Sequence, residues 1–250
     1  MRAGLCYKRL MATAPTRLAS PLCIALDTPD LDRARALVRE VGEAAGLVKI
    51  GMEFFYAHGA VGYDAIAAEG AAIFLDLKLH DIPNTVHAAL ASLMRLETPP
   101  AMIDIHASGG AAMMQAAARA VRGRSKVIAV TVLTSLADED LADVGFDPAK
   151  PAAELVVSMA LMAKDCGLDG VVCSPVDLPA VRAACGPKFL TVVPGLRPAD
   201  SEVGDQKRVS TPAQAWEAGA DFLVVGRPVT AAQDPAAAAR DILASLGERP

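Results

Sequence analysis

The sequence predicts an α/β protein that folds as a closed (β/α)8 TIM barrel. Eight short apolar segments alternate with eight helical patterns along the 250 residues, and no change in composition divides them. Alternating strands and helices imply a parallel sheet, and eight such units in about 250 residues fit a closed barrel. A doubly wound sheet built from two halves is the alternative architecture.

The predicted strands are short runs rich in Val, Ile and Leu, which suit a parallel sheet covered by helices. They are Leu22–Leu26, Leu47–Ile50, Ala72–Leu77, Met102–His106, Val127–Leu133, Gly170–Cys173, Phe189–Val193 and Phe222–Val225. Helices are predicted after them over residues 31–44, 52–69, 84–96, 110–121, 152–166, 177–184, 211–218 and 235–246. Glycines stand where several of these helices end and prolines where several begin, as is common at helix termini.

The domain organisation is predicted to be simple. Residues 21–250 are expected to form a single catalytic barrel domain, because no linker or low-complexity tract interrupts them. Residues 1–20 contain clusters of Lys and Arg ahead of Pro15, and we interpret them as a disordered N-terminal extension. A weak targeting presequence is the alternative interpretation. Long connections over residues 134–150 and 194–210 are candidate lids.

Composition and charge argue against several classes of partner. A formal net charge of −5 without a long basic run argues against nucleic acid. No apolar stretch reaches the length of about 18 residues that a membrane span needs. The five cysteines are odd in number and contain no C-x-x-C pair, which indicates reduced thiols in a cytoplasmic protein. The Gly-rich dinucleotide and P-loop motifs and the G-x-S-x-G motif are absent.

Charged side chains stand at the carboxyl ends of the first three predicted strands. Asp27 follows strand 1, Lys49 lies in strand 2, and Asp76 and Lys78 are two positions apart in strand 3. Residues two apart share a face, and adjacent strands lie about 4.8 Å apart, so these side chains can meet in the barrel mouth. Buried charges are costly unless paired, and alternating Lys and Asp side chains pair them. We interpret the cluster as catalytic; a structural ion-pair network is the alternative.

A longer motif begins in the third strand. The segment Asp76-Leu-Lys-Leu-His-Asp-Ile-Pro-Asn-Thr85 resembles the D-x-K-x-x-D-I-P-N-T signature of the orotidine 5'-phosphate decarboxylase family. Other motifs of that family follow in order along most of the chain outside residues 1–20. They are Leu26-Asp27, Val48-Lys49-Ile50-Gly51, His106-Ala-Ser-Gly-Gly110, Thr131-Val-Leu-Thr-Ser135, Pro194-Gly-Leu-Arg-Pro198, Gly204-Asp-Gln-Lys-Arg208 and Val225-Gly-Arg-Pro228.

The resemblance implies roles for the charged residues. In that family the reacting carboxylate of the substrate lies against an array that matches Lys49, Asp76, Lys78 and Asp81. The residue that matches Lys78 donates the proton. The family is dimeric, and the residues that match Asp81 and Thr85 belong to an edge shared with the neighbouring subunit. The resemblance therefore implies a homodimer with shared active sites.

The resemblance also implies substrate contacts. Asp27 and Lys49 match positions that hold the ribose hydroxyls, and Thr134 and Ser135 match contacts to the pyrimidine edge. Capping of the loop after strand 5 is the alternative role for Thr134 and Ser135. The phosphate is expected between the loops after strands 7 and 8, where barrels commonly bind phosphate. The candidates in those loops are Pro194, Arg197, Gln206, Gly226 and Arg227, and a rim salt bridge is the alternative role of Arg227.

The implied activity is the decarboxylation of orotidine 5'-phosphate to uridine 5'-phosphate in pyrimidine biosynthesis. It implies no cofactor and no metal, with electrostatic stabilisation of a carbanion at C6 and protonation by a lysine. One alternative is a related sugar-phosphate decarboxylase or aldolase with Mg²⁺ held between Asp76 and Asp81. A Schiff-base aldolase that uses Lys49 or Lys78 and a non-catalytic nucleotide-binding barrel are the others.

Overall fold

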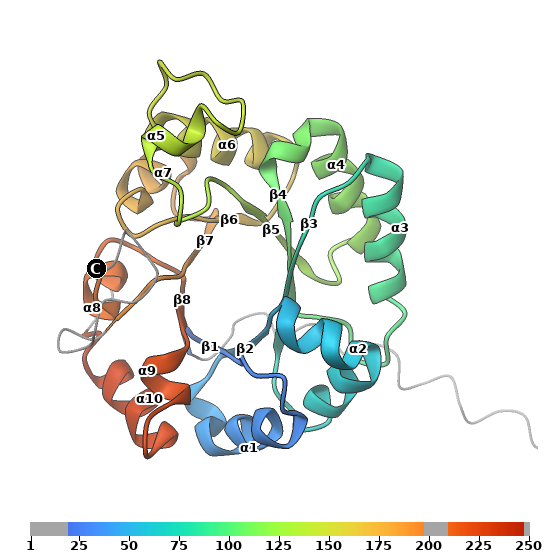
Figure 1. Ribbon diagram of the computed structural model, residues 1–250, viewed down its shortest axis with the longest axis vertical. Helices are drawn as coiled ribbons and strands as arrows, with labels where there is room; N and C mark the ends of the chain where they lie inside the picture. Colours follow the sequence, from blue (N-terminus) through green and yellow to red (C-terminus); the bar gives the residue numbers. More distant parts are fainter. Residues whose placement is uncertain (1–19, 198–209, 248–250) are drawn as a thin grey trace, which may run out of the picture.

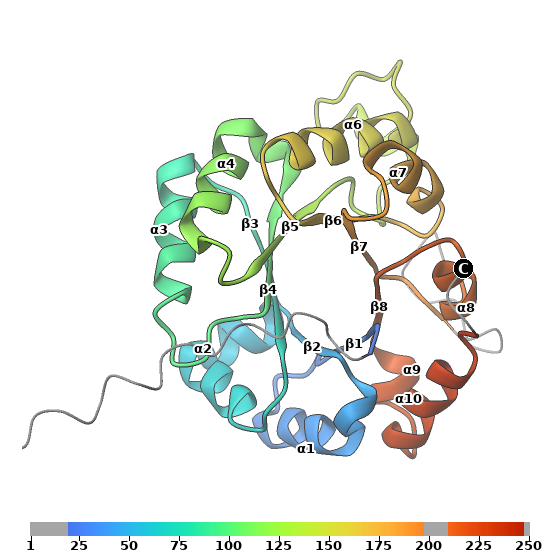
Figure 2. The same cartoon turned by 180° about the vertical axis from the view of Figure 1, so that it is seen from behind.

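The barrel is closed by eight parallel strands in sequence order, which confirms the predicted fold class and excludes the doubly wound alternative. The computed structural model describes residues 20–197 and 210–247. Figures 1 and 2 show the ring of strands from its two ends, with the helices around the outside. The strands are β1 (Leu22–Ala25), β2 (Leu47–Ile50), β3 (Ile73–Leu79), β4 (Met102–His106), β5 (Lys126–Val130), β6 (Gly170–Val172), β7 (Leu190–Val193) and β8 (Phe222–Val225).

Eight helices follow the strands in the described residues, close to their predicted places. They are α1 (Leu31–Val41), α2 (Met52–Ala67), α3 (Pro83–Leu93), α4 (Gly110–Val121), α6 (Ala152–Asp165), α7 (Leu178–Cys185), α8 (Pro212–Glu217) and α10 (Pro235–Ala244). Side-chain caps start several of them: Asp30 accepts the N–H of Arg33, and Thr211 forms a reciprocal capping box with Gln214. Two single-turn 3-10 helices, η1 (Gly42–Ala44) and η2 (Ala107–Gly109), complete two of the connections.

Besides shifts of one to three residues at other strand and helix ends, four details differ from the sequence prediction. The short helices α5 (Asp138–Leu141) and α9 (Arg227–Thr230) lie in segments that were expected to be loop. The predicted fifth strand extended to Leu133, but β5 ends at Val130, and Val132 and Leu133 beyond it line a cavity. The third strand continues to Leu79, beyond the predicted end at Leu77, through an irregular pairing with β4.

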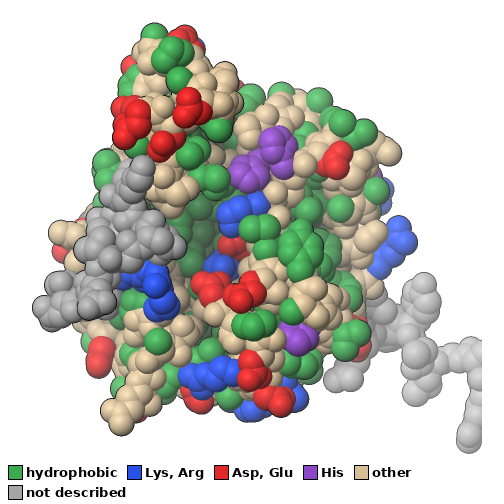
Figure 3. All heavy atoms as spheres, viewed as in Figure 1, with side chains coloured by type: hydrophobic (Ala, Val, Ile, Leu, Met, Phe, Trp, Pro, Cys, Tyr) green, Lys and Arg blue, Asp and Glu red, His purple; other side chains and the backbone are tan. Residues whose placement is uncertain are grey.

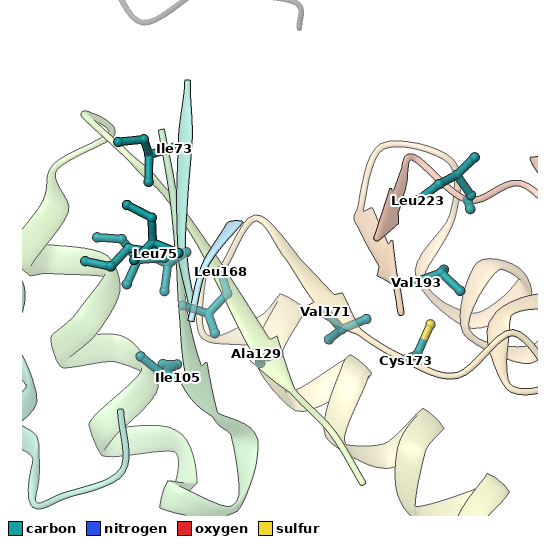
Figure 4. Close-up of a cluster of buried hydrophobic side chains, with 14 of the residues drawn as sticks. Ile73, Leu75, Ile105, Ala129, Leu168, Val171, Cys173, Val193 and Leu223 are labelled. Carbon is teal, nitrogen blue, oxygen red and sulfur yellow. The ribbon is translucent and has the colours of Figure 1, made fainter. Parts of the chain in front are cut away.

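Two apolar layers hold the barrel together. Inside the ring, Ala25, Phe74, Met102 and other alternate residues of the strands form a small interior cluster. Residues of the opposite strand faces, such as Leu75, pack outward against the helices in a larger core, part of which Figure 4 shows. The alternation of side chains along each strand divides the residues between the two layers. It therefore also decides which polar side chains face the barrel interior.

Several predictions concern residues outside the described ranges. The proposed disordered extension lies there except for Ser20, whose buried hydroxyl donates to the carbonyl of Ala44 at 2.7 Å. Most of the candidate lid over residues 194–210 is also outside the described residues. The two ends of that segment are described, and the N–H of Arg197 donates to the carbonyl of Ser210 at 3.0 Å. None of the helices in the described ranges combines the length and the apolar character needed to cross a membrane.

An ion pair secures the end of the barrel opposite to the strand ends that carry the charged motif. Arg182 of α7 donates to Asp221, which precedes β8, at 2.7 Å, and to the carbonyl of Phe189, which precedes β7, at 2.8 Å. Asp221 also accepts the backbone N–H of Thr191 at 2.9 Å. The two charged side chains are only 18% and 12% exposed. Contacts at this end of a barrel serve stability, since the chemistry lies at the other end.

We expect Arg182→Ala to lower the free energy of unfolding by about 3 kcal/mol, because the substitution leaves the carboxylate of Asp221 poorly solvated and without its arginine. Urea unfolding at one protein concentration measures the change. Arg95→Ala is the control, since Arg95 is exposed in the connection after α3. A midpoint for Arg182→Ala equal to that of Arg95→Ala would contradict the prediction.

Candidate active site

A cavity of about 310 Å³ opens at the carboxyl ends of the strands. Figure 3 shows the hollow on this face, where Lys and Arg side chains lie beside Asp and Glu side chains. The size is at the lower end of the range for small-molecule sites. The structure brings most of the predicted site residues to its walls. Those residues are Asp27, Lys49, Asp76, Lys78, Thr134, Pro194, Arg197, Gly226 and Arg227.

The charged side chains form a continuous chain of ion pairs across three strands. Lys49 Nζ lies 3.2 Å from Asp27 Oδ1 and 3.2 Å from Asp76 Oδ2. Lys78 Nζ contacts the other oxygen of Asp76. The exposed fraction of the side chain falls from 59% for Asp27 to 12% for Lys49 and 10% for Asp76, so the chain runs inward from the rim. The predicted alternation of Lys and Asp is confirmed.

Strand alternation explains why these side chains meet. Asp27, Lys49 and Asp76 each stand two positions after an apolar residue of the interior cluster, namely Ala25, Leu47 and Phe74. The Cα partners also align, because Lys49 pairs with Ala25 on one side and with Phe74 on the other. Each strand therefore ends its apolar interior row with a charged residue that points into the mouth.

Lys78 reaches the cluster by a different route. Its φ of 49° lies in the left-handed region, which non-glycine residues seldom adopt. Between Leu75 and Leu79 the pairing with β4 slips, since four steps along β3 face only two steps along β4, from Ile103 to Ile105. Such a backbone conformation costs on the order of 1–3 kcal/mol and is typical of functional sites. Regular alternation, on which the prediction for Lys78 depended, does not describe this segment.

The environment shifts the pKa values of the central pair in opposite directions. Burial favours the neutral form of Asp76, but the ammonium of Lys49, a hydrogen bond from Asp104 and the ammonium of Lys78 outweigh it, and they hold the pKa of Asp76 well below its usual range. Burial also acts against the charged form of Lys49, yet the carboxylates of Asp76 and Asp27 raise its pKa. Both groups are therefore charged at neutral pH, and the site keeps a fixed array of opposite charges.

A second part of the cavity suits an anionic group. Arg197 after β7 and Arg227 after β8 both line it, and Gly226 stands beside them. A Cβ atom placed on Gly226 would lie 3.5 Å from Asp27 Oδ2, which is an ordinary contact distance. The neighbouring protein atoms would therefore tolerate a side chain there, and the glycine instead leaves that space to the cavity. Guanidinium groups bind phosphate through charge-assisted hydrogen bonds.

Other predicted residues do not line this cavity. Asp81 is exposed and accepts the backbone N–H of Ile82 at 2.6 Å, just before α3. Thr85 is exposed in the first turn of α3, and Ser135 is exposed in the loop after β5. Gln206 lies outside the described residues. The cavity of one chain therefore brings together the Lys–Asp–Lys array but not the residues that the motif assigns to a shared edge.

Sequence reasoning missed one buried acid in the cavity wall. Asp104 of β4 is 1% exposed and stands two positions after Met102 of the interior cluster. Its Oδ1 accepts the backbone N–H of Lys78 at 2.8 Å. The pattern Met102-Ile-Asp-Ile-His106 contained the signal, since its alternation gives Asp104 the interior face.

Two histidines border the same region. The rings of His80 and His106 lie 5.4 Å apart between their centroids, and burial, His80 and Lys78 lower the pKa of His106. In the part of the chain that the structure describes, no three His, Cys, Asp or Glu side chains are grouped so that they could hold a metal ion.

Comparison with known proteins identifies the family. The model of the "Orotidine 5'-phosphate decarboxylase / HUMPS family" matches residues 20–242. This chain belongs to that family. The resemblance inferred from the ordered motifs is therefore confirmed, and the family match covers all eight strands of the barrel.

Individual members of the decarboxylase family are similar over nearly the whole chain. The orotidine 5'-phosphate decarboxylase of Paramagnetospirillum magneticum is 48% identical over 238 residues, which cover 92% of this chain and 100% of that protein. The one from Erythrobacter litoralis is 51% identical over 229 residues, with the same coverage. A crystal structure of the Lactobacillus acidophilus enzyme matches with a TM-score of 0.79 at 36% identity, covering 91% of this chain and 99% of that one.

Proposed function

We propose that this chain decarboxylates orotidine 5'-phosphate to uridine 5'-phosphate and CO2 in pyrimidine biosynthesis, as the names of its relatives state for them. The observation that carries the proposal is the Lys49–Asp76–Lys78 array in the wall of a cavity that also contains two arginines. The array offers charge to the reacting centre, and the arginines offer charge to a phosphate. Both features agree with a small nucleotide substrate that has two anionic groups, a carboxylate and a phosphate.

The difficulty of the reaction lies in the carbanion. When the bond between C6 and the carboxyl group breaks, the electron pair stays on C6 in the plane of the pyrimidine ring. There it cannot delocalise into the π-system of a neighbouring carbonyl. Stabilisation must therefore come from fixed charges placed near C6 before the bond breaks. The ammonium of Lys78, held against Asp76 in the cavity wall, is the group that meets this need.

Lys78 also completes the reaction. Its Nζ transfers a proton to C6, which yields uridine 5'-phosphate, and the neutral amine then regains a proton from solvent. Asp76 is ionised and would face the substrate carboxylate, so its repulsion is relieved as neutral CO2 leaves. A positioned proton donor contributes about 10²–10⁴-fold to a rate. The larger part of the catalysis comes from the charge array and from binding of the remote phosphate.

The remaining contacts orient the nucleotide. Asp27 and Lys49 hold the ribose hydroxyls, and Thr134 meets the pyrimidine edge, with Ser135 beside it. At the other end of the cavity, Arg227 and Arg197 bind the phosphate, with Pro194, Gly226 and Gln206 completing that region. Binding energy from the phosphate then serves to hold C6 against Lys78, which is how remote groups of a substrate raise kcat.

The decisive experiment follows the ultraviolet absorbance of orotidine 5'-phosphate with purified protein in the presence of EDTA. We expect complete conversion to uridine 5'-phosphate at a rate that EDTA leaves unchanged. Loss of activity in EDTA that Mg²⁺ restores would favour the metal-dependent sugar-phosphate alternative. No conversion with or without Mg²⁺ would refute the proposed activity.

The structure offers little support to the other candidate functions. In the metal-dependent alternative Asp76 would bind a divalent cation, yet its two oxygens already contact the ammoniums of Lys49 and Lys78. A Schiff base needs a neutral amine, whereas the neighbouring carboxylates raise the pKa of Lys49. Borohydride trapping with substrate tests that alternative directly.

A homodimer with shared sites is part of the proposal. Asp81 and the neighbouring Ile82 are exposed beside the barrel mouth, and the side chain of Ile82 is 67% exposed. Further large apolar side chains that follow strand ends are also exposed, which agrees with a protein partner at this face. They are Met52, Leu133 and Val176. A second copy of the chain that covers α3 would carry Asp81 to the neighbouring cavity.

We expect Asp81→Ala and Lys78→Ala to be nearly inactive alone and to regain activity as a mixed dimer. If Asp81 serves the partner's site, one site of the mixed dimer has both defects and the other has neither. Up to half of the wild-type activity per dimer should then return. Co-expression with two tags and purification through both provides the mixed dimer for assay.

The matched control pairs Lys78→Ala with Asp76→Ala. Both residues line the cavity of their own chain, so each site of that mixed dimer keeps one defect and activity should stay low. A verified mixed dimer of Asp81→Ala and Lys78→Ala that is no more active than this control would mean that Asp81 acts in its own subunit.

A further inference from the structure

The buried acid Asp104 has no role in the mechanism above, although it interacts with both Lys78 and Asp76. Its Oδ1 accepts the backbone N–H of Lys78 at 2.8 Å, and its Oδ2 lies 3.9 Å from Lys78 Nζ. Its carboxyl group also interacts with the carboxylate of Asp76, which raises its pKa. Only 1% of the surface of Asp104 is exposed, so water does not compete for these contacts.

The closeness of the two acids favours a shared proton. Two buried carboxylates repel each other, whereas a neutral carboxylic acid can donate a hydrogen bond to a neighbouring carboxylate. Asp76 has Lys49 Nζ at 3.2 Å and Lys78 Nζ in direct contact, whereas Lys78 Nζ lies 3.9 Å from Asp104. The lysines therefore keep Asp76 charged, and the proton resides on Asp104. Burial and then the charge of Asp76 raise the pKa of Asp104, which agrees.

The charge balance within the ion-paired array leads to the same assignment. Asp27 and Asp76 balance Lys49 and Lys78, so the array is neutral before substrate binds. An ionised Asp104 would add an uncompensated negative charge in the buried wall, which is costly. It would also compete with Asp76 and with the substrate for the ammonium of Lys78.

We propose that Asp104 is a positioning residue for decarboxylation that works as a neutral carboxylic acid. Its carbonyl oxygen holds the backbone of Lys78 in the left-handed turn, and its O–H group donates to Asp76. One side chain thus sets both the position of the proton donor and the orientation of the carboxylate that pairs with it. The catalytic part of this inference rests on the proposed decarboxylase function, whereas the protonation of Asp104 does not.

The test compares two substitutions of similar size. In Asp104→Asn the amide keeps an acceptor for the N–H of Lys78 and a donor for Asp76, so kcat should stay within about threefold of wild type. In Asp104→Leu both hydrogen bonds are lost, and kcat should fall by about 10- to 100-fold, as expected when buried polar groups lose their partners. KM for orotidine 5'-phosphate should change by less than about threefold in both, since the loss concerns the chemical step.

A second measurement detects the proton itself and needs no substrate. The infrared difference between wild type and Asp104→Asn at neutral pH in D2O should contain the carbonyl stretch of a carboxylic acid. Asp169→Asn and Asp169→Leu are the controls, because Asp169 also accepts a backbone N–H, that of Val127 at 2.9 Å, but at the opposite end of the barrel. Their kcat should equal that of wild type, and Asp169→Asn should remove no acid band.

Three results would overturn the inference. They are the absence of the acid band from wild type, a kcat for Asp104→Leu equal to that of wild type, and an Asp104→Asn variant as impaired as Asp104→Leu. Because the infrared measurement uses the free protein, it decides the protonation of Asp104 even if Asp104→Leu fails to fold. A wild-type protein that has the acid band but does not convert orotidine 5'-phosphate would refute the proposed function instead.

Discussion

Replacing Lys78 with Ala is expected to reduce kcat by about 10²–10⁴-fold or more, the contribution of a positioned proton donor. The substitution removes the ammonium that contacts Asp76 Oδ1 in the cavity wall. Among the described residues, no other lysine forms an ion pair with that oxygen atom. Nucleotide binding should survive, because the two arginines at the other end of the cavity remain. Stopped assays with orotidine 5'-phosphate give kcat, and calorimetric titration with uridine 5'-phosphate measures binding.

The control is Lys188→Ala, which removes an exposed lysine between α7 and β7, at the end of the barrel away from the cavity. Its kcat and unfolding midpoint should match those of the wild-type protein. If Lys78→Ala kept more than about a tenth of the wild-type kcat, Lys78 would not be the proton donor.

For Arg227→Ala we expect a selective loss on the phosphorylated substrate. A charge-assisted, bidentate contact to phosphate contributes about 1.5–3 kcal/mol, so kcat/KM for orotidine 5'-phosphate should fall by about 10- to 100-fold. The value for orotidine, which lacks the phosphate, should change little. The ratio of the two kcat/KM values is therefore the measurement, because it cancels any general damage to the site.

Two further variants sharpen this result. Arg227→Lys keeps the charge but not the planar pair of donors, so it should recover only part of the lost kcat/KM. Arg240→Ala removes an exposed arginine of α10 and should leave both substrates unaffected. Equal losses on the two substrates in Arg227→Ala would show that Arg227 does not bind the phosphate.

Much of the barrel could be predicted because its signals are local. The strands β2, β4 and β8 have the predicted bounds, and α4 has them too, since short apolar runs and helix termini are written in neighbouring residues. The short helices α5 and α9 were missed because four residues form too brief a pattern to separate from a loop. The end of β5 was predicted three residues too late, because the apolar residues that follow the strand look in the sequence like its continuation.

The candidate site divides in a similar way. Alternation within a strand, together with the resemblance, predicted that Asp27, Lys49 and Asp76 would meet. In the structure Lys49 Nζ lies 3.2 Å from a carboxylate oxygen of each of the two acids. Alternation also assigned Asp104 to the interior, but a lone acid in an apolar strand was overlooked without knowledge of its neighbours. The contributions of Asp81 and Thr85 depend on a second chain and stay predictions.

The sequence by itself determined the family, the order of the eight β/α units and the charged residues at the strand ends, because these depend on residue types and short spacings. Only the tertiary structure decided how Lys78 reaches Asp76. Its left-handed backbone at the irregular pairing of β3 with β4 is stabilised by Asp104, 26 positions along the chain. A local pattern cannot encode the hydrogen bond between Lys78 and Asp104. That bond stabilises the fold only after β3 and β4 have paired and water has been excluded from Asp104.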